Sequence, residues 1–483
     1  MRRLLVALLS CLLACTSHAA TPTRLDAGTA QRDLRILQKA LFELHPAVDR
    51  YVAPEALDAA FAAAQADVAG GADRATMYRL ASRLSATLRC GHTWTNPLNQ
   101  RADVQAEVFA AADKLPVWIK VVDDRFLVVA SSDPQVRRGD ELLAIDGRPA
   151  ATLIAELLPY LRADGISDGK RRAQLDSDSN GGAMDRLFPA LHPPQAGRYR
   201  LRLLDAQGRE RTRTVRATNV AARDAALARR GIVPAREDWS FAVDTSGIAT
   251  LRLPTFAFWN RQFDWKTELD RVFAVVGSGT VRGLIVDLRD NEGGDDDIGD
   301  RLHAWLLTAA FTKPAVTPYS RFERVPYTLA RFLETWDFSY FDRTGKLTRL
   351  GDRRYRYDSR IEPPLTIQPV AAAVRVPTAV LTGPQMSSAG FIIARDLKLS
   401  GAATLIGHRT GGNRRGLNGG ELGWITLPGS GVAVDIAMIA WEPDGEQPDG
   451  GIEPDIAVAE DFEAIRAGRD PDDEAARRWL AAQ

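Results

Sequence analysis

The chain has 483 residues, which is enough for several domains with sizeable cores. Basic and acidic residues balance at 62 each, so no overall electrostatic field favours nucleic acid or an anionic membrane. The apolar fraction of 45% and the charged fraction of 26% are those of a soluble globular protein, and they exclude a fibrous or disordered class.

Residues 1–19 have the pattern of a secretory signal segment. Arg2 and Arg3 form a positive start, an apolar run follows over 4–14, and small residues at 17–19 offer a cleavage site. The apolar run is too short for a structural membrane helix. Leu12-Leu13-Ala14-Cys15 resembles a bacterial lipobox, so soluble secretion and a lipid anchor on Cys15 both stay open. A periplasmic or secreted protein, or an outer-membrane lipoprotein, is expected.

Cysteine and histidine usage argues against metal and disulfide chemistry. Cys11 and Cys15 lie in the signal segment, which leaves Cys90 as the thiol of the mature chain. No intramolecular disulfide framework and no cysteine-based metal site is therefore expected. The histidines are scattered without the i, i+4 spacing of a metal-binding helix. We expect neither a cofactor nor a metal.

Residues 25–112 are predicted to form an N-terminal helical domain. Alanine and leucine recur at helical spacing over 33–44, 54–68 and 76–88. The last helix runs into Leu88-Arg89-Cys90-Gly91-His92-Thr93, where the glycine is a helix-ending signal. His92 is therefore expected on a loop just beyond a helix.

Residues 115–218 are predicted to form a β domain. Two apolar runs flank Asp123-Asp124 in the manner of a hairpin. The string R-G-D-E-L-L-A-I-D-G-R-P at 138–149 resembles the strand-and-turn signature of PDZ domains, whose sheet edge takes up an extended peptide end. An ordinary hairpin with an Asp-Gly turn is the alternative. Residues 164–194, rich in Asp, Ser, Gly and Arg, are expected to be an irregular insertion.

Residues 240–460 have the pattern of an α/β core. A strand at 247–254, an amphipathic helix at 263–276 and an apolar strand at 283–288 predict a right-handed βαβ unit. The second strand leads into a polar turn that ends at Gly293-Gly294. A glycine pair there can expose backbone N–H groups to an oxyanion, or it can serve a tight turn with positive φ.

Ser388 is predicted to lie between a strand and a helix. An apolar run at 376–381 indicates a buried strand, Gly383-Pro384 ends it, and 391–399 has helical spacing. A hydroxyl near the positive end of a helix dipole suits a nucleophile, and it also suits a plain N-cap. The local pattern by itself favours the cap.

Two further stretches complete the chain. Aromatic residues are concentrated between Tyr319 and Tyr357, either as buried core or as a lid that faces a substrate. In the C-terminal segment 461–483, a helix is predicted over 471–480, with Asp470 as its N-cap and Pro471 at its first position.

Four separated motifs resemble those of the tail-specific (C-terminal-processing) and tricorn-core serine peptidases. In chain order they are R-C-G-H-T around His92, V-D-L-R-D-N-E-G-G ending at Gly294, S-S-A-G-F around Ser388 and G-I-E-P-D-I-A-V from Gly451. The PDZ-like string stands between the first two, as in that family. The resemblance implies an α/β fold with a crotonase-like catalytic core, an N-terminal helical domain and a PDZ-like β module. Phe391 stands where the family usually has a glutamate.

The resemblance implies that Ser388 is the nucleophile of a serine endopeptidase. The N–H of Ala389, with one from Gly293 or Gly294, would form the oxyanion hole. The tail-specific branch uses a downstream lysine as base, but Asn413 occupies the matching position here. The one lysine after Ser388 is Lys398, and it would lie about 15 Å away along a helix. A Ser-Lys pair is therefore not expected.

The tricorn-like branch implies a histidine base and an orienting carboxylate instead. His92 matches the base by its Gly-His-Thr setting, with His45 as a competitor, and His408 is interpreted as structural. The carboxylate would be Glu446, just before the closing motif, with Asp449 as the alternative.

The implied substrate is an unfolded or C-terminal segment of a peptide or protein, and nucleic acid is not expected as a partner. A catalytically inactive peptide- or ligand-binding protein on the same scaffold is the alternative, because a fold does not fix its chemistry. The sequence gives no signal for cleavage preference or oligomeric state.

Overall fold

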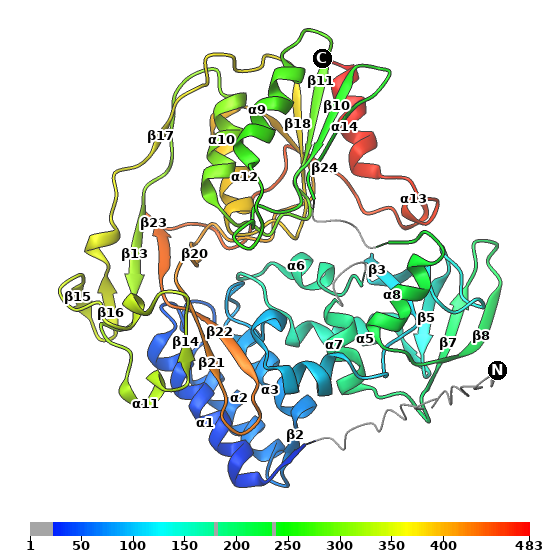
Figure 1. Ribbon diagram of the computed structural model, residues 1–483, viewed down its shortest axis with the longest axis vertical. Helices are drawn as coiled ribbons and strands as arrows, with labels where there is room; N and C mark the ends of the chain where they lie inside the picture. Colours follow the sequence, from blue (N-terminus) through cyan, green and yellow to red (C-terminus); the bar gives the residue numbers. More distant parts are fainter. Residues whose placement is uncertain (1–22, 178–181, 234–237) are drawn as a thin grey trace, which may run out of the picture.

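The computed structural model describes residues 23–177, 182–233 and 238–483, so the predicted signal segment lies outside the described part. Figure 1 shows an α/β part that lies across from a larger part made of the N-terminal helices and several β-sheets. The mixed α/β class predicted from the sequence is confirmed. The boundaries of the separate domains stay a prediction.

Three N-terminal helices are present as predicted, the second and third within two residues of the expected bounds and the first beginning six residues earlier. They are α1 (Ala27–Leu44), α2 (Pro54–Asp67) and α3 (Arg74–Thr87). Asp26 and Asp73 cap α1 and α3 by accepting a hydrogen bond from a backbone N–H of the first turn. The apolar side chains of α1 recur at helical spacing and are buried. They pack α1 into a core that it shares with α2, α3 and several strands.

The β domain is a six-stranded sheet in the order β3-β4-β5-β7-β8, with β6 paired to β5. Asp123 and Asp124 turn between β3 and β4 with positive φ values of 50° and 55°, which confirms the predicted hairpin. Its strands are β3 (Val117–Val122), β4 (Arg125–Ser131), β5 (Glu141–Ile145), β6 (Arg148–Pro149), β7 (Arg198–Leu204) and β8 (Glu210–Arg216), and helix α5 (Ala150–Leu157) follows β6.

The segment expected to be an irregular insertion contains two ordered helices, α6 (Asp168–Ala173) and α7 (Ala183–Leu191), and that expectation was wrong. Asp185 of α7 forms a buried ion pair with Arg223 of α8 (Val220–Ala228) at 2.7 Å. Between the two helices, Ser177 donates its N–H to the carbonyl of Ile119 in β3. Tertiary pairing of polar residues, which leaves no periodic signal, therefore orders this segment.

The α/β part is built on a six-stranded sheet in the order β24-β19-β18-β11-β10-β9. All neighbours pair in parallel except β9, which is antiparallel at one edge. The predicted βαβ unit is β10–α9–β11, and β10 and β11 do pair in parallel. The strands are β9 (Ser240–Val243), β10 (Ile248–Arg252), β11 (Gly283–Asp287), β18 (Thr378–Thr382), β19 (Thr404–Gly407) and β24 (Ile456–Ala457).

Helices cover both faces of this sheet (Figure 1). Leu284 and Val286 of β11 point into one core with α9 (Trp265–Val276), α10 (Asp296–Leu306) and α12 (Ala389–Ser400). Ile285, between them, points the other way and packs with α14 (Pro471–Ala481). Successive strand residues alternate between faces, so a strand that is apolar throughout is buried on both sides.

The remaining strands form smaller sheets, of which the pair β12-β17 packs against α10 of the α/β part. The aromatic stretch is split: Phe322, Tyr340 and Tyr357 are buried, as the core alternative predicts, whereas Tyr327 and Trp336 are exposed. A lid that faces a substrate stays a prediction. These elements are β12 (Phe311–Thr312), β13 (Val316–Ser320), α11 (Tyr327–Ala330), β14 (Leu333–Glu334), β15 (Thr348–Gly351), β16 (Arg354–Arg356), β17 (Thr366–Ile367), β20 (Leu417–Asn418), β21 (Leu422–Thr426), β22 (Ala433–Ala437) and β23 (Ala440–Pro443). The short elements elsewhere are β1 (Arg24–Leu25), β2 (Ala72–Asp73), α4 (Ala102–Val104) and α13 (Phe462–Arg466).

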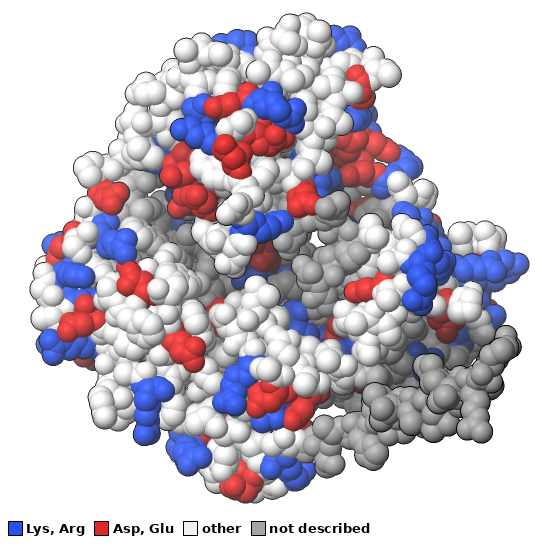
Figure 2. Space-filling view, in the orientation of Figure 1, with Lys and Arg blue, Asp and Glu red and all other residues white. Residues whose placement is uncertain are grey.

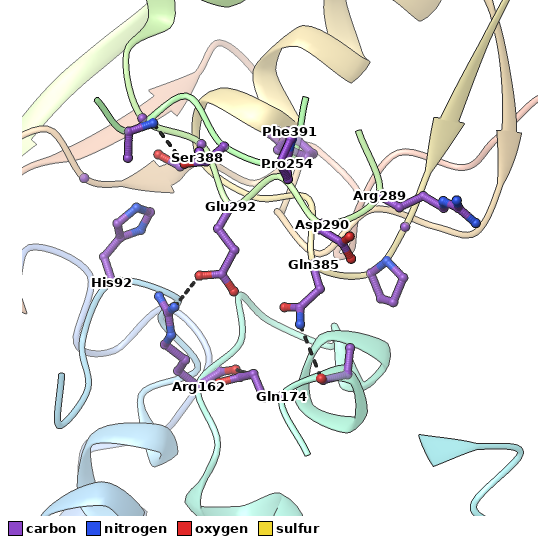
Figure 3. A pocket seen from close by; sticks show the side chains of 18 of the residues that line it. His92, Arg162, Gln174, Pro254, Arg289, Asp290, Glu292, Gln385, Ser388 and Phe391 are labelled. Carbon is purple, nitrogen blue, oxygen red and sulfur yellow. Dashed lines mark hydrogen bonds and ion pairs between the residues drawn. The ribbon is translucent and has the colours of Figure 1, made fainter. Parts of the chain in front are cut away.

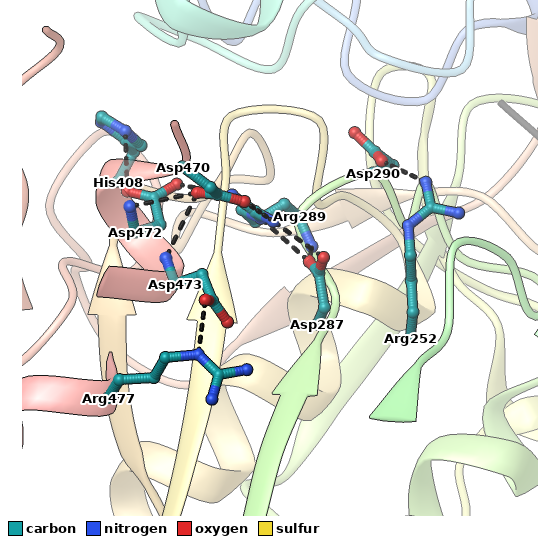
Figure 4. Close-up of polar contacts among 9 residues, drawn as sticks. All are labelled: Arg252, Asp287, Arg289, Asp290, His408, Asp470, Asp472, Asp473 and Arg477. Carbon is teal, nitrogen blue, oxygen red and sulfur yellow. Dashed lines mark hydrogen bonds and ion pairs between the residues drawn. The ribbon is translucent and has the colours of Figure 1, made fainter. Parts of the chain in front are cut away.

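An ionic cluster ties the C-terminal helix to the end of β11 (Figure 4). The Arg289 guanidinium contacts Asp287 at 2.9 Å, Asp470 at 2.8 Å and Asp472 at 3.1 Å. Asp470 is also the N-cap of α14, as predicted. His408 lies 3.4 Å from Asp472, and its hydrogen bond to that carboxylate raises the pKa of its imidazole. His408 thus holds a structural position in the cluster.

Figure 2 shows acidic and basic side chains interspersed over the visible face. Across residues 23–177, 182–233 and 238–483, no helix is long and apolar enough to cross a bilayer. The same residues contain no group of three His, Cys, Asp or Glu side chains that could hold a metal ion. Cys90 is buried and free.

Candidate active site

Ser388 occupies a strained turn between β18 and α12. Its φ of 52° and ψ of −132° lie outside the regions that L-residues usually adopt. Ser388 takes the N-cap position of α12, but its side chain makes no capping hydrogen bond. The residue lines a large cleft instead. A half-buried, uncapped hydroxyl that lines a cleft at the start of a helix favours the nucleophile interpretation over the plain cap.

The loop after β11 brings Gly293 and Gly294 against this turn. The Asn291 side chain holds the loop by donating to the Leu253 carbonyl at 2.8 Å and accepting from the Gly293 N–H at 2.8 Å. Both glycines have positive φ, 101° and 139°. A Cβ atom on Gly293 would lie 2.7 Å from the Cβ of Ser388, so only glycine allows this approach.

The three predicted oxyanion-hole donors are not equivalent. The Gly293 N–H is already engaged by Asn291. Within the described residues, the N–H groups of Gly294 and Ala389 have no hydrogen-bond acceptor. Ala389 begins α12, where the first N–H groups have no partner inside the helix. Gly294 and Ala389 are therefore the two predicted donors whose N–H groups are not already engaged.

His92 follows α3 on a loop, as predicted, and lines the same cleft as Ser388. Figure 3 shows both side chains facing this cleft. Burial lowers the pKa of His92 to about 4, and the cations Arg162 and Lys170 add to this effect against Asp164 and Glu292. The imidazole is therefore neutral over the physiological range. His45, the competing histidine, is fully buried and does not line the cleft.

Arg162 connects the His92 loop to the glycine loop. It donates to the Gly91 carbonyl at 2.6 Å and to the Glu292 carboxylate at 2.6 Å, and its guanidinium lies 3.8 Å from the centre of the Trp94 ring. Figure 3 shows the contact between Arg162 and Glu292. Burial by itself would raise the pKa of Glu292, but Arg162 and Lys170 lower it to about 2. The two loops are thus held together by charge.

The structure does not bring the predicted orienting carboxylates to His92. Glu446 is exposed, and it forms no hydrogen bond or ion pair within the described residues. Asp449 accepts hydrogen bonds from the Asn413 side chain at 2.7 Å and from the Ile166 N–H at 3.2 Å. Neither interaction involves the imidazole.

Asp164 is the acid that sequence reasoning missed. It is buried, and its Oδ1 accepts the Gly91 N–H at 2.7 Å, one residue before His92. Its other oxygen and the Nδ1 of His92 are both buried without a hydrogen-bond partner among the described residues. Of the charges around His92, that of Asp164 acts most strongly on its pKa. The segment rich in Asp and Gly held no pattern that singles out this position.

Lysine is also present at the site, although not where the sequence suggested. Lys398 donates to the Glu453 carbonyl at 2.6 Å and pairs with Asp455 at 2.9 Å, away from Ser388. Lys170 of α6, which comes before the core in the chain, donates to the Ser387 hydroxyl at 2.5 Å. Lys398 therefore makes its contacts away from Ser388, whereas Lys170 bonds to the neighbouring residue, Ser387.

The cleft that contains Ser388 and His92 has a volume of about 3150 Å³. Sites for small ligands usually enclose about 300–1,000 Å³. Aromatic and apolar side chains on both sides of the cleft, among them Trp94, Trp336, Phe391 and Trp441, offer contact area for a long ligand. The size favours an extended polymer over a small molecule.

Comparison with known proteins agrees with this geometry. Residues 247–458 match the family model described as Peptidase family S41. The solved structure of mature CPAF complexed with lactacystin is 18% identical and covers 94% of this chain and 98% of its own, with a TM-score of 0.61. A second structure, of mature CPAF, has a TM-score of 0.60 at the same identity and covers 94% of this chain and 96% of its own.

The photosystem II D1 C-terminal processing protease is 17% identical over 90% of this chain and 96% of its own, with a TM-score of 0.36. No curated protein matches the chain. The CPAF structures therefore show the fold, and the family match covers the part of the chain that carries Ser388 and the glycine loop.

Proposed function

We propose that this chain cleaves extended polypeptide segments, with Ser388 as nucleophile and His92 as base. It is a serine-type peptidase, and its residues 247–458 match the model of peptidase family S41. The proposal rests on one observation: the strained Ser388 turn, the glycine loop and the neutral His92 all line the same long cleft. These parts come from three distant segments of the chain.

The proposed reaction proceeds through an acyl-enzyme. The Ser388 oxygen bonds to the carbonyl carbon of the scissile peptide while its proton passes to His92. The N–H groups of Gly294 and Ala389 stabilise the negative charge that develops on the carbonyl oxygen. The carbon–nitrogen bond then breaks, and His92 returns the proton to the leaving amine. A water molecule releases the acyl group by the same steps.

For the orienting carboxylate we propose Asp164. A carboxylate in a triad fixes the tautomer of the histidine and stabilises the imidazolium. Asp164 is held against the residue before His92, and one of its oxygens lacks a partner, as does the Nδ1 of His92. A turn of the imidazole that pairs these two groups would complete a triad. Glu446 remains the candidate from the sequence and is compared with Asp164 below.

The proposed substrate is an unfolded segment that lies along the cleft. The sequence suggested that an edge of the β domain adds an extended peptide. The outer edge of β3 is occupied at Ile119 and Val121, whose backbone groups bond to Ser177 and to the Asp176 carboxylate. Substrate binding is therefore assigned to the cleft, and the PDZ-like mode is not part of the proposal.

Labelling with a fluorophosphonate probe tests the proposal. This probe reacts with an activated serine, so the wild-type chain is expected to be labelled, and Ser388→Ala is expected to lose both labelling and cleavage of an unfolded protein. Ser387→Ala, one residue away, should still be labelled. A chain that binds unfolded protein but is not labelled would instead be the inactive binding protein of the alternative hypothesis.

The pH dependence of kcat/KM follows from the environment of His92. A general base works in its neutral form, so activity falls as pH drops through its pKa. Because that pKa is lowered to about 4, the acid limb is expected well below the ordinary value of 6.5. Initial rates between pH 3.5 and 8 measure it, and recovery of activity at pH 7 after each incubation excludes unfolding. An acid limb at or above 6.5 would contradict the assignment of His92.

A further inference from the structure

Lys170 is one of the most completely buried charged side chains in the described part of the protein. The residue is 1% exposed, and it projects from α6 between the loop after β11 and the turn before α12. Its Nζ donates to the Ser387 hydroxyl at 2.5 Å and lies 3.6 Å from a Glu292 oxygen. A buried ammonium group is costly unless it is paired and hydrogen-bonded.

The two partners of Lys170 are the immediate neighbours of the reacting groups. Ser387 precedes the proposed nucleophile, and Glu292 precedes Gly293 and Gly294. Ser387 also donates its N–H to the Asn291 carbonyl at 3.3 Å, so the two loops already touch. The ammonium of Lys170 is therefore a third point that fixes the distance between Ser388 and the glycine loop.

On this basis, and resting on the proposed function, we propose that Lys170 is a positioning residue of the peptidase: its ammonium group holds Ser387 and Glu292 so that Ser388 and the oxyanion-binding glycine loop stay in register. Nothing in the sequence indicated this role, because Lys170 precedes the catalytic core and its segment was expected to be irregular.

A role of Lys170 as the base for Ser388 fits the geometry less well. Lys170 bonds to Ser387, whose hydroxyl is buried and does not line the cleft, whereas Ser388 does line it. Burial lowers the pKa of Lys170, but the adjacent Glu292 carboxylate counteracts this by favouring the ammonium form. An ammonium group has no lone pair with which to take a proton.

Lys170 also acts on His92 through its charge. The charged groups around the imidazole are Asp164, Arg162, Lys170 and Glu292, two acids and two cations. Removing one cation leaves an excess of negative charge, which stabilises the imidazolium and raises the pKa of His92. The loss of a buried cation that lies far from His92 would not raise this pKa.

The test compares Lys170→Met with Ser387→Ala in the full chain, with cleavage of an unfolded fluorescent protein as the assay. Displacing reacting groups by about 1 Å costs on the order of 10²-fold in rate. We expect Lys170→Met to lower kcat by about 10- to 100-fold with little change in KM, and to move the acid limb to higher pH. Ser387→Ala keeps the charge, so it should lower kcat while leaving the acid limb in place.

Arg343→Met is the matched control, because Arg343 is 0% exposed, bonds to Glu421 and the Met438 carbonyl, and does not line the cleft. It should lower stability but not kcat per folded molecule. Wild-type kcat and an unmoved acid limb in Lys170→Met would overturn the inference, provided that Ser388→Ala is inactive. An active Ser388→Ala would overturn the proposed function instead. If Lys170→Met does not fold, an unchanged kcat in Ser387→Ala overturns the inference.

Discussion

Replacing His92 by alanine is expected to lower kcat by about 10⁴- to 10⁶-fold, close to the effect of Ser388→Ala. Without the imidazole, the Ser388 hydroxyl loses its proposed base, and a neutral hydroxyl is a poor nucleophile. Residues that act as a unit are not additive, so the double variant should be no slower than either single one. Single-turnover cleavage of an unfolded protein measures all three rates.

The same assay decides which carboxylate orients His92. Asp164→Asn should lower kcat strongly and also lower the pKa of His92, because it removes the anion that acts most on the imidazole. Glu446→Gln, at an exposed position, should have a smaller effect. The reverse order would restore Glu446 as the triad member. Lys398→Ala is the neutral control, and full activity in His92→Ala would exclude any triad that contains this histidine.

Replacing Gly293 by alanine is expected to lower kcat by about 10²- to 10³-fold, as does the loss of one oxyanion-hole donor in other hydrolases. The new Cβ would lie 2.7 Å from the Ser388 Cβ and 2.8 Å from the Ala389 nitrogen, so the nucleophile and one donor must both move. The φ of 101° adds backbone strain for any residue other than glycine. Steady-state kinetics and the rate of fluorophosphonate labelling measure the effect.

Gly279→Ala is the matched control for backbone strain. Gly279 has a φ of 89°, but a Cβ there would meet no atom within 4 Å. Both variants should lose a similar amount of unfolding free energy from the strained backbone, about 1 kcal/mol. The loss of kcat should be confined to Gly293→Ala. Equal kinetics in the two variants would show that contact with Ser388 does not matter.

Much of the α/β part could be predicted because its elements are set by local patterns. The strand before Ser388, the helix after it and the C-terminal helix with its Asp470 cap all lie within two residues of the predicted bounds. Apolar runs of strand length and helical spacing are read directly from neighbouring residues. The position of His92 beyond a helix end followed from a single glycine in the same way.

The partners of the catalytic residues could not be predicted, since they depend on packing between distant segments. Lys170 and Ser387 are 217 positions apart, and Asp164 and Gly91 are 73 apart. No periodicity links such residues. The segment that supplies Asp164 and Lys170 is polar, and ion pairs and side-chain hydrogen bonds fix its helices. Sequence reasoning searched for a lysine and an orienting carboxylate after Ser388, whereas the fold brings Asp164 and Lys170 from segments before it.

The ion pairs of Arg289 extend the structural unit around Ser388 beyond the residues that match the family model. The family match stops at residue 458, yet two of the three carboxylates around Arg289 belong to Asp470 and Asp472. Ala476 and Leu480 pack on the sheet face opposite α12. Arg289 stands three residues before Glu292. Its ion pairs with the start of α14 therefore help to fix the position of the glycine loop. The loop is thus held by one segment that precedes the α/β core and by another that follows residue 458.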